Sequence, residues 1–390
     1  MRKAKKLELI PPYLFAQIDK KKAELISKGV DIINFGIGDP DLPTPKHITE
    51  SLHRAIDDPD SHGYPPYEGT KAFRRAVAAW YKKRFGIDLD PENEVISLIG
   101  SKEGIAHIFP AFVDPGDIAL CPDPAYPVYK IGTLLANGKP FIFKLRPENN
   151  FLPDFSDIDP DTAQKAKILF INYPNNPTGA SAPEKTLKEA VEFCKEYDIL
   201  LCSDLAYSEI AYDGYKPQSI FEIPGAKDIA IEFHSLSKTY NMTAHRIGMA
   251  VGNAEAIRAL STVKTNIDSG AYKAIQACAV TALTGPQECI DANNKIWQER
   301  RDLIIGGLNN LGWEITPPRA AFYIFAPVPK NFTSVSFADH LLSKCGILVV
   351  PGTGYGEQGE GFVRLAITIN KERIKEAIIR LKQAGISFSK

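Results

Sequence analysis

Lys238 closes the segment His234-Ser235-Leu236-Ser237-Lys238, which follows an apolar run. Desolvation of a lysine lowers the pKa of its ammonium group, and the free amine can form a Schiff base with a carbonyl compound. Taken alone, a lysine at the end of a strand more often reaches into solvent. Lys238 therefore indicates carbonyl chemistry only if neighbouring segments supply the rest of a site.

Three other residue types needed for such a site, Asp, Ser and Arg, follow apolar runs or lie near Lys238. Asp204 could hold the protonated nitrogen of a pyridine ring, although an Asp after a strand is more often a helix N-cap. Ser235, Ser237 and Arg246 offer hydroxyls and a guanidinium to a phosphate group. A predicted helix starts near Ser101, and its N-terminus would add backbone N–H donors. Together these residues suit a phosphorylated carbonyl cofactor that contains a ring.

The elements that would position these residues are short apolar runs that alternate with longer amphipathic stretches between about residues 45 and 285. This pattern predicts an α/β fold with a mostly parallel seven-stranded sheet between helices. Strands are expected over 95–99, 118–121, 141–143, 168–172, 199–202, 229–233 and 249–251, and a helix over 71–85. Parallel sheets bind ligands beyond the carboxyl ends of their strands, which is where Asp204 and Lys238 lie.

The pattern changes from about residue 286, where a smaller α+β unit is expected. Strands are predicted over 322–325 and 363–367, and a final helix over 372–384. We therefore expect a large domain over 45–285 and a small domain made of 1–44 and 286–390.

The composition argues against several classes of function. The 390 residues carry a formal net charge of −1, which gives no electrostatic reason to expect nucleic acid or a membrane surface as a partner. Pro11 and Pro12, rather than an apolar segment, follow the basic N-terminus, so we expect no signal peptide and a cytoplasmic protein. Six cysteines without a C-x-x-C pair and seven dispersed histidines predict neither a disulfide nor a metal site.

The segment 235–248 resembles the cofactor-lysine signature of the class I aminotransferases, in which an arginine follows the lysine by eight positions. The tetrapeptide 176–179 (Asn-Pro-Thr-Gly) and the pair Asp204 and Tyr207 resemble the family's other hallmarks, in the expected order. The likeness covers essentially the whole chain. It implies PLP fold type I, pyridoxal 5'-phosphate (PLP) as cofactor, and Lys238, Asp204 and Tyr207 as catalytic residues.

The resemblance also implies how the cofactor is held. Lys238 would carry PLP and move the substrate's α-proton, and Asp204 would keep the ring nitrogen protonated. Tyr207 and Asn176 would hydrogen-bond the ring oxygen, and Tyr126 would stack on the ring. The expected cofactor contacts are Ser101, Lys102, Tyr126, Asn176, Asp204, Tyr207, Ser235, Ser237, Lys238 and Arg246, with Tyr64 from the neighbouring subunit of a homodimer.

Arg364 lies where the family keeps the arginine that binds the substrate's α-carboxylate through two parallel N–H···O bonds. Its place in the apolar run 362–367 argues against an idle surface charge. Further substrate contacts are expected from Gly38, Tyr13, Lys102, Tyr126 and Asn176. The candidates for the distal end of the substrate are Tyr13, Gly38, Lys102, Tyr67 and Glu68. The loop 266–270 is expected, like Tyr64, to act across the dimer interface.

A closer likeness is to the LL-diaminopimelate aminotransferases, carried by the segments 9–15, 35–45, 98–107, 122–129 and 266–270. It implies amino transfer between LL-diaminopimelate and 2-oxoglutarate in lysine biosynthesis. Alternatives on this scaffold are an aspartate, alanine or N-succinyl-diaminopimelate aminotransferase, a β-lyase, and a non-catalytic PLP-binding protein. Ala244 and His245 replace the family's usual glycine and bulky residue, which leaves the local turn and the substrate choice open.

Overall fold

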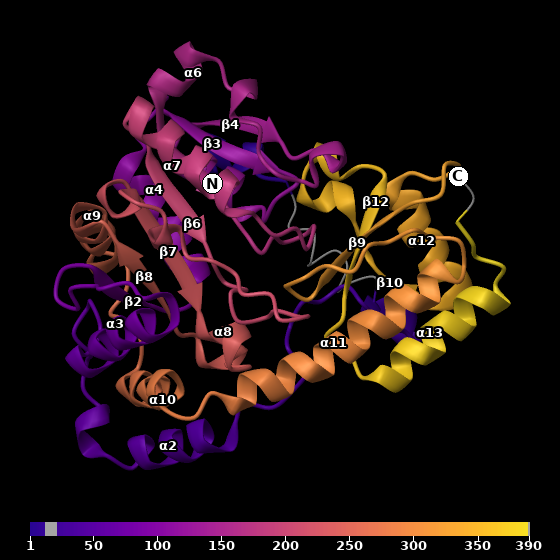
Figure 1. The fold of residues 1–390 in the computed structure, drawn as a ribbon, viewed down its shortest axis with the longest axis horizontal. Coiled ribbons are helices and arrows are strands. Elements are labelled where there is room, and N and C mark those ends of the chain that lie inside the picture. Colours follow the sequence, from indigo (N-terminus) through magenta and orange to yellow (C-terminus); the bar gives the residue numbers. More distant parts are fainter. Residues whose placement is uncertain (12–21, 389–390) are drawn as a thin grey trace.

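The computed structural model describes residues 1–11 and 22–388, which fold around one large β-sheet and two smaller ones (Figure 1). The larger sheet has the strand order β2-β8-β7-β6-β5-β3-β4. Its strands are β2 (Val95–Leu98), β3 (Ile118–Asp123), β4 (Lys139–Lys144), β5 (Ala166–Ile171), β6 (Leu200–Asp204), β7 (Ala230–Ser235) and β8 (Gly248–Gly252). Strand β8 runs opposite to the other six and is antiparallel to both of its neighbours, β2 and β7. The predicted seven-stranded, mostly parallel sheet is confirmed, and each predicted run overlaps one strand.

Both faces of this sheet are apolar, because successive residues of a strand point to opposite sides. In β5, Ile168 and Phe170 pack into one core, whereas Leu169 packs into another. The first core is covered by α4 (Ser101–Phe112), α5 (Val128–Leu135) and α9 (Ala254–Thr265), and the second by α3 (Lys71–Phe85), α7 (Glu184–Tyr197) and α10 (Lys273–Thr284). Helices on both sides cover a sheet whose strands are apolar throughout.

The predicted helix over 71–85 is confirmed as α3. The Thr70 hydroxyl accepts a hydrogen bond from the Phe73 backbone N–H and caps its first turn. Gly86 ends the helix at φ 74°, in the left-handed region that glycine enters without strain. Beside α10 lies α2 (Lys46–Ile56).

A second sheet organises the C-terminal part of the chain. It joins β11 (Val350–Pro351), β12 (Phe362–Ala366) and β9 (Tyr323–Pro327) in antiparallel order, and β1 (Ile33–Asn34) pairs with β10 (Ile347–Leu348) nearby. The helices α11 (Glu288–Asn309), α12 (Ser334–Cys345) and α13 (Lys371–Gln383) surround this sheet. Phe35 packs into the same core as Trp297 and Leu365. The domain boundaries at 44/45 and 285/286 stay a prediction.

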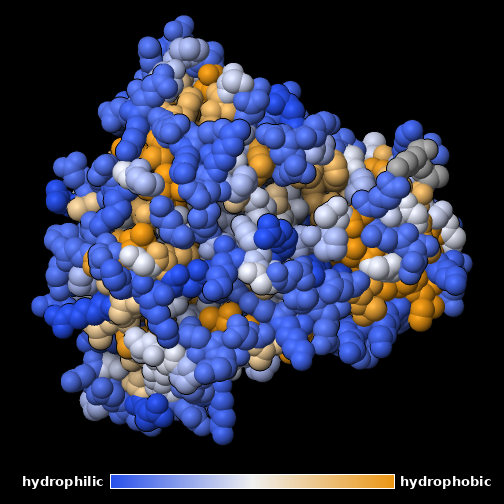
Figure 2. Space-filling view, in the orientation of Figure 1, coloured by the Kyte–Doolittle hydropathy of each residue, from blue (hydrophilic) through white to orange (hydrophobic). Residues whose placement is uncertain are grey.

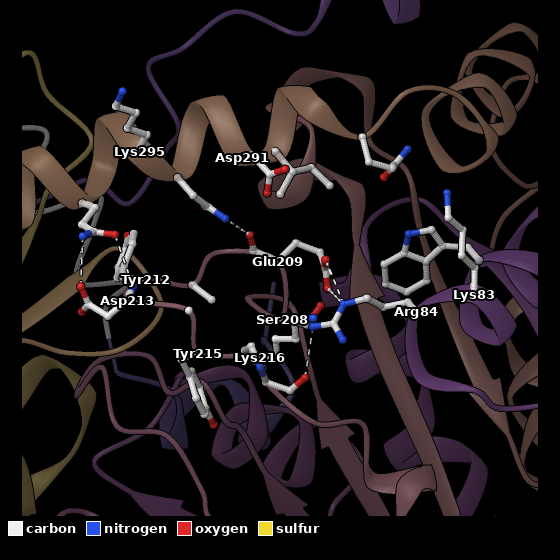
Figure 3. Close-up of a pocket in the computed structure, with 18 of the residues that line it drawn as sticks. Lys83, Arg84, Ser208, Glu209, Tyr212, Asp213, Tyr215, Lys216, Asp291 and Lys295 are labelled. Carbon is white, nitrogen blue, oxygen red and sulfur yellow. Dashed lines mark hydrogen bonds and ion pairs between the residues drawn. The ribbon is translucent and has the colours of Figure 1, made fainter.

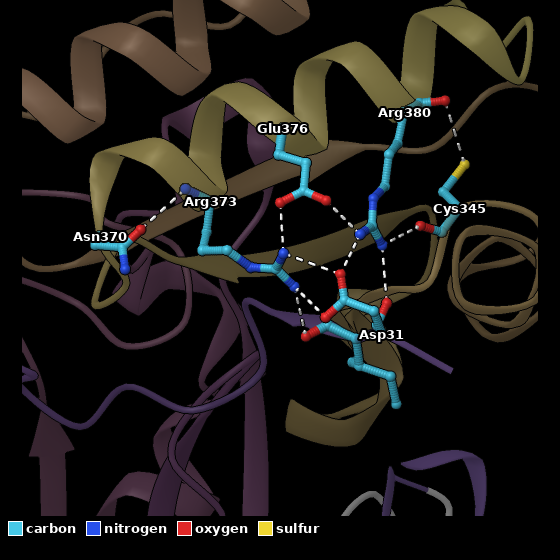
Figure 4. A network of polar contacts seen from close by, with 7 residues as sticks. Asp31, Cys345, Asn370, Arg373, Glu376 and Arg380 are labelled. Carbon is cyan, nitrogen blue, oxygen red and sulfur yellow. Dashed lines mark hydrogen bonds and ion pairs between the residues drawn. The ribbon is translucent and has the colours of Figure 1, made fainter. Parts of the chain in front are cut away.

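An exposed charge network ties the N-terminal segment to α13 (Figure 4). Arg373 Nη2 lies 2.7 Å from Asp31 Oδ1, and Arg380 also contacts the Asp31 carboxylate. Glu376 pairs with both arginines. The two guanidiniums lower the pKa of Asp31, Arg373 contributing most. This network holds the chain just before β1 against the last helix.

The remaining helices are short. They are the α-helices α6 (Pro160–Lys165) and α8 (Leu236–Thr239) and 3-10 turns at Lys5–Leu9, Pro59–Ser61, Pro147–Asn149, Phe155–Asp157, Ile220–Glu222, Ala226–Asp228, Thr243–His245, Gly352–Tyr355 and Glu357–Gly359. Among the described residues, no helix combines the length and apolar character needed to cross a membrane. The face seen in Figure 2 is mostly hydrophilic, with hydrophobic side chains gathered mainly over the C-terminal part.

Candidate active site

A cavity of about 330 Å³ opens at the carboxyl ends of β5, β6 and β7. These three strands are parallel, so the segments that follow them meet at one edge of the sheet. Twelve residues predicted for the site line this cavity: Gly38, Ser101, Lys102, Tyr126, Asn176, Asp204, Tyr207, Ser235, Ser237, Lys238, Arg246 and Arg364. Segments far apart in the chain therefore converge as the sequence predicted.

Lys238 lies in α8, one turn after the end of β7. Its Nζ donates a 2.9 Å hydrogen bond to the Gly38 backbone oxygen. Burial lowers the pKa of the Lys238 ammonium to about 8, against an opposing contribution from the Asp39 carboxylate. The nearby guanidiniums of Arg364 and Arg246 lower this pKa further. A substantial fraction of Lys238 is therefore the free amine near neutral to mildly alkaline pH.

Asp204 ends β6 and faces the same cavity. Its Oδ2 accepts a 2.7 Å hydrogen bond from the Tyr129 hydroxyl. Its Oδ1 is buried and makes no hydrogen bond of normal geometry to another described residue. Burial raises the pKa of Asp204 to about 6, although the Tyr129 hydroxyl and the Ala206 backbone N–H lower it. A buried carboxylate oxygen that lacks a donor is suited to a cationic N–H group of a ligand.

A second polar corner of the cavity is built from the start of α4 and from Arg246. Gly100 precedes α4 at φ 96°, and a Cβ placed there would lie 2.2 Å from Arg246 Nη2. Arg246 donates to the backbone oxygens of Ile99 at 3.3 Å and Thr243 at 2.8 Å. Ser101 lies at the N-terminus of α4, a 12-residue helix. A guanidinium beside a helix N-terminus and serine hydroxyls forms an anion-binding corner.

Arg364 crosses the opposite side of the cavity and is 2% exposed. It donates to Asn176 Oδ1 at 3.0 Å and to the Gly36 backbone oxygen at 2.7 Å. Its guanidinium carbon lies 4.4 Å from the centre of the Tyr323 ring and 4.9 Å from that of Tyr355. Stacking between two aromatic rings orients this guanidinium.

The aminotransferase class I and II family model matches residues 30–381. The chain belongs to this family.

Proteins and structures similar to this aminotransferase agree with the predicted class and fold. LL-diaminopimelate aminotransferase 2 of Trichormus variabilis is 57% identical over 100% of both chains. LL-diaminopimelate aminotransferase of Moorella thermoacetica is 55% identical over 98% of both chains. The substrate-bound structure of BacF from Bacillus subtilis matches with a TM-score of 0.97 and 36% identity, covering 100% of this chain and 99% of that one.

The segment that follows Tyr207 borders a second pocket, a groove of about 780 Å³ that is also lined by residues of α3 and α11 (Figure 3). Arg84 of α3 pairs with both carboxylate oxygens of Glu209 at 3.0 and 3.1 Å. Asn294 of α11 donates to the Glu209 backbone oxygen at 2.8 Å. Further along, Arg301 pairs with Asp213 at 2.6 Å. The helices α3 and α11 thus fix the segment after β6 in place.

Several predicted contacts of the aminotransferase lie outside the cavity. Tyr64 is 86% exposed and does not line it, and Tyr67 and Glu68 are also exposed. Tyr13 lies outside the described residues. A Cβ on Gly270 would lie 3.1 Å from Pro65, so the segments around Tyr64 and 266–270 lie side by side. The predicted roles of Tyr64 and this loop across a dimer stay predictions.

The loop 266–270 is anchored through a buried ion pair to α4. Lys264 Nζ lies 2.6 Å from Asp268 Oδ1 and 3.5 Å from Glu103 Oε2. Glu103 and Asp268 also form, with His107, a set of potential metal ligands. Lys264 already supplies a positive charge at these carboxylates, so their arrangement is that of an internal ion pair.

The sequence departure at Ala244 does not itself strain the backbone of this turn. Positive φ values occur at Asn241 (54°) and Arg246 (53°), and Ala244 is not among the residues with positive φ. His245 is half-buried, and burial lowers its pKa. A glycine is therefore not required at position 244.

Three residues at the site were missed by sequence reasoning: Tyr129, Tyr323 and Asp39. Tyr129 contacts Asp204 from α5, and Tyr323 and Asp39 line the cavity. Asp39 directly follows Gly38, so its place next to a predicted contact was an available signal. Tyr129 and Tyr323 lie in apolar elements and cannot be told apart from core tyrosines by pattern alone.

Proposed function

We propose that this chain is a PLP-dependent aminotransferase that acts on LL-diaminopimelate with 2-oxoglutarate as the amino-group partner, in lysine biosynthesis. The names of its relatives support the substrate. The observation that carries the proposal is that Lys238 and the buried carboxylate of Asp204 line the same cavity. A lysine with a lowered pKa and an acid that can hold a ring nitrogen are the pair that PLP chemistry requires.

The cavity residues fit PLP at both ends. Asp204 Oδ1, buried and without a hydrogen bond of normal geometry to a described residue, would face the pyridine nitrogen. Ser101, Ser235, Ser237 and Arg246 would hold the phosphate. When bound, PLP supplies the electron sink that makes the substrate's α-proton acidic.

Different residues of the site would then transfer the proton, bind the substrate and contact the cofactor ring. Lys238 Nζ would accept the α-proton and return it, because its lowered pKa leaves the free amine accessible. Arg364, oriented by Asn176 and by its aromatic neighbours, would bind the α-carboxylate and fix which Cα–H bond faces Lys238. Tyr207 and Asn176 would hydrogen-bond the ring oxygen, and Tyr126 would stack on the ring.

LL-diaminopimelate carries a second ammonium and a second carboxylate, which need partners away from Arg364. Asp39 and Lys102 line the cavity with opposite charges and could serve these two groups. Aspartate and alanine lack a distal ammonium group. Contacts to that ammonium would therefore favour diaminopimelate over aspartate, alanine and the N-succinyl derivative.

The proposed functional unit is a homodimer in the cytoplasm. Tyr64, Tyr67, Ile267 and Tyr272 are large exposed side chains on adjacent segments. A cluster of exposed aromatic and aliphatic groups is typical of a surface that a second subunit covers. All six cysteines are free thiols, which suits a reducing compartment.

Absorption and half-reactions test the proposal. Purified protein loaded with PLP should show a visible band near the violet edge, and Lys238→Ala should abolish it. LL-diaminopimelate should convert the cofactor to its amine form faster than aspartate, alanine or N-succinyl-diaminopimelate. A colourless protein would contradict the cofactor, and conversion by aspartate but not by diaminopimelate would contradict the substrate.

A further inference from the structure

We propose that Tyr323 is a positioning residue that donates a hydrogen bond to Tyr207 and thereby strengthens and aims the Tyr207 hydroxyl at the ring oxygen of the cofactor. This inference rests on the proposed function. It concerns a residue that contacts three parts of the site: its hydroxyl lies against Tyr207 and Gly38, and its ring lies against Arg364.

The first observation is a direct contact between the two hydroxyls. Tyr323 begins β9 and is 2% exposed, and its Oη lies 2.8 Å from the Oη of Tyr207. A phenol has a single O–H to donate but accepts through its lone pairs. If Tyr207 donates its proton to the cofactor, the bond between the two tyrosines must run from Tyr323 to Tyr207.

The second observation is that the Tyr323 ring is held on two further sides. A Cβ on Gly38 would lie only 2.4 Å from Tyr323 Oη, so the backbone of Gly38 packs directly against this hydroxyl. The guanidinium of Arg364 stacks on the Tyr323 ring at 4.4 Å. The hydroxyl therefore cannot swing away from Tyr207 without disturbing both neighbours.

Burial keeps both phenols protonated, whereas the nearby charges act in both directions. Asp204 disfavours a phenolate at either position, Arg364 favours one, and Asp39 and Lys238 line the same cavity. Burial is the largest influence and raises the pKa of Tyr207 well above its ordinary value. Tyr207 therefore acts as a hydrogen-bond donor, and donation from Tyr323 polarises its O–H bond.

A purely structural pair would behave differently. The two rings also pack edge to face, with centroids 5.4 Å apart and planes at 80°. Such packing contributes to stability whether or not the hydroxyls are present. The test must therefore remove the Tyr323 hydroxyl, keep the ring, and read a property of the cofactor environment rather than stability or turnover.

The experiment is a pH titration of the visible absorption band in the PLP-loaded protein. A donor to the negatively charged ring oxygen stabilises the form that has lost its proton, so weakening that donor raises the pH midpoint. We expect Tyr323→Phe to raise the midpoint by roughly half a unit to one unit, the size of one neutral hydrogen bond. Tyr207→Phe should raise it further, and the double variant should match Tyr207→Phe alone.

Tyr212→Phe is the matched control. Tyr212 is equally buried and lies in the segment after β6. Its hydroxyl donates a 2.8 Å hydrogen bond to the Ala321 backbone oxygen. Removing the Tyr212 hydroxyl should leave the pH midpoint of the absorption band unchanged. Gly38→Ala, which pushes against the Tyr323 hydroxyl without removing it, should shift the midpoint in the same direction as Tyr323→Phe and serves if that variant fails to fold.

An unchanged midpoint in Tyr323→Phe, an equal shift in Tyr212→Phe, or additive shifts in the double variant would overturn the inference. A wild-type protein without a visible band would instead overturn the proposed function on which it rests. The two failures are therefore distinguishable in one set of spectra.

Discussion

At the scale of single residues, the reactivity of Lys238 depends on a balance between burial and one carboxylate. Burial brings the pKa of its ammonium to about 8, and Asp39 is the group that raises it. Burial therefore lowers the pKa of Lys238 while Asp39 raises it by a smaller amount. The contribution of Asp39 can be removed by substitution without changing the lysine.

We predict that the rate of PLP incorporation into the cofactor-free protein rises with pH and is half-maximal near pH 8, since only the free amine of Lys238 reacts. Asp39→Asn removes the negative charge that stabilises the ammonium, so its midpoint should be lower. Stopped-flow absorption at a series of pH values measures both. Asp57→Asn, which removes an exposed carboxylate at the end of α2, should keep the wild-type midpoint. A midpoint that rises in Asp39→Asn would contradict this account.

Asp204 shows why an acidic residue in a sequence does not by itself indicate a ligand-binding site. An Asp after a strand suits an N-cap as well as a ligand, and the sequence could not decide between them. The structure decides because Tyr129 occupies one carboxylate oxygen while the other is buried without a normal hydrogen bond to a described residue. That asymmetry arises from a contact across 75 residues of chain, which no local pattern encodes.

At the scale of elements, strand β7 contains a buried acid, Glu232, that does not line the cavity. Glu232 accepts hydrogen bonds from the hydroxyls of Tyr81, Ser203 and Ser219 and from the Ile220 backbone N–H, at 2.7 to 3.0 Å. Burial outweighs these donors and raises the pKa of Glu232 from 4.5 to about 7. The strand that leads to Lys238 therefore contains a group that titrates near neutrality.

We predict that Glu232 makes the protein less stable as the pH rises from about 4.5 to about 7. In that window the folded state binds the proton and the unfolded state releases it, so the free energy of unfolding falls by at most about 1.4 kcal/mol per pH unit. Glu232→Gln keeps a neutral side chain and should lose this slope. Urea unfolding at three pH values measures the difference between the two proteins.

The comparison between variants is needed because His234 acts in the opposite sense. Burial lowers its pKa from 6.5 to about 3, so His234 makes the folded state more stable as the pH rises through that range. Since both proteins contain His234, its contribution cancels in the difference. Equal slopes in wild type and Glu232→Gln would show that Glu232 ionises alike in both states.

Some elements of the fold could be predicted from the sequence and others could not, for physical reasons. The strands of the large sheet were predictable because both of their faces are apolar, and α3 because its stripe ends at Gly86. The reversed direction of β8 was not predicted, since pairing direction is set by long-range contacts. The two-residue strands β1 and β10 are too short to leave a pattern. Tyr323 belongs to a predicted strand, but its role comes from partners on three other segments.

At the scale of the whole molecule, the exposed Tyr64 raises the question of which subunit it serves. Its side chain lies outside the cavity of its own chain. The proposed dimer resolves this, because a residue that reaches a partner's phosphate must be exposed in an isolated subunit. The exposure of Tyr64 is therefore consistent with the proposed role across the dimer interface.

We predict that two inactive variants restore activity to each other when they are mixed in one dimer. Lys238→Ala lacks the reactive amine but keeps Tyr64, and Tyr64→Ala lacks the phosphate contact but keeps Lys238. A hybrid dimer contains one site with both residues intact if Tyr64 acts across the interface. Co-expression with two affinity tags isolates the hybrid, and its activity per dimer should be about half that of wild type.

The control for this experiment pairs Lys238→Ala with Asp204→Ala. In that hybrid the Asp204→Ala site keeps the lysine but lacks its own acid, and the other site lacks the lysine, so activity should stay absent. Equal activity in the two hybrids, or none in the first, would contradict the shared site. Analytical ultracentrifugation of the wild type should give the mass of two chains.

The ties among Asp31, Glu376 and the two arginines of α13 have a consequence for synthesis. Gly36 and Gly38, which contact Arg364 and Lys238, follow directly after the segment that this network holds. The segment that leads into β1 can therefore make these contacts only after α13, near the end of the chain, has been synthesised. We therefore expect a chain that ends before α13 to lack the arginines that pair with Asp31 and to hold the segment with Gly36 and Gly38 less firmly.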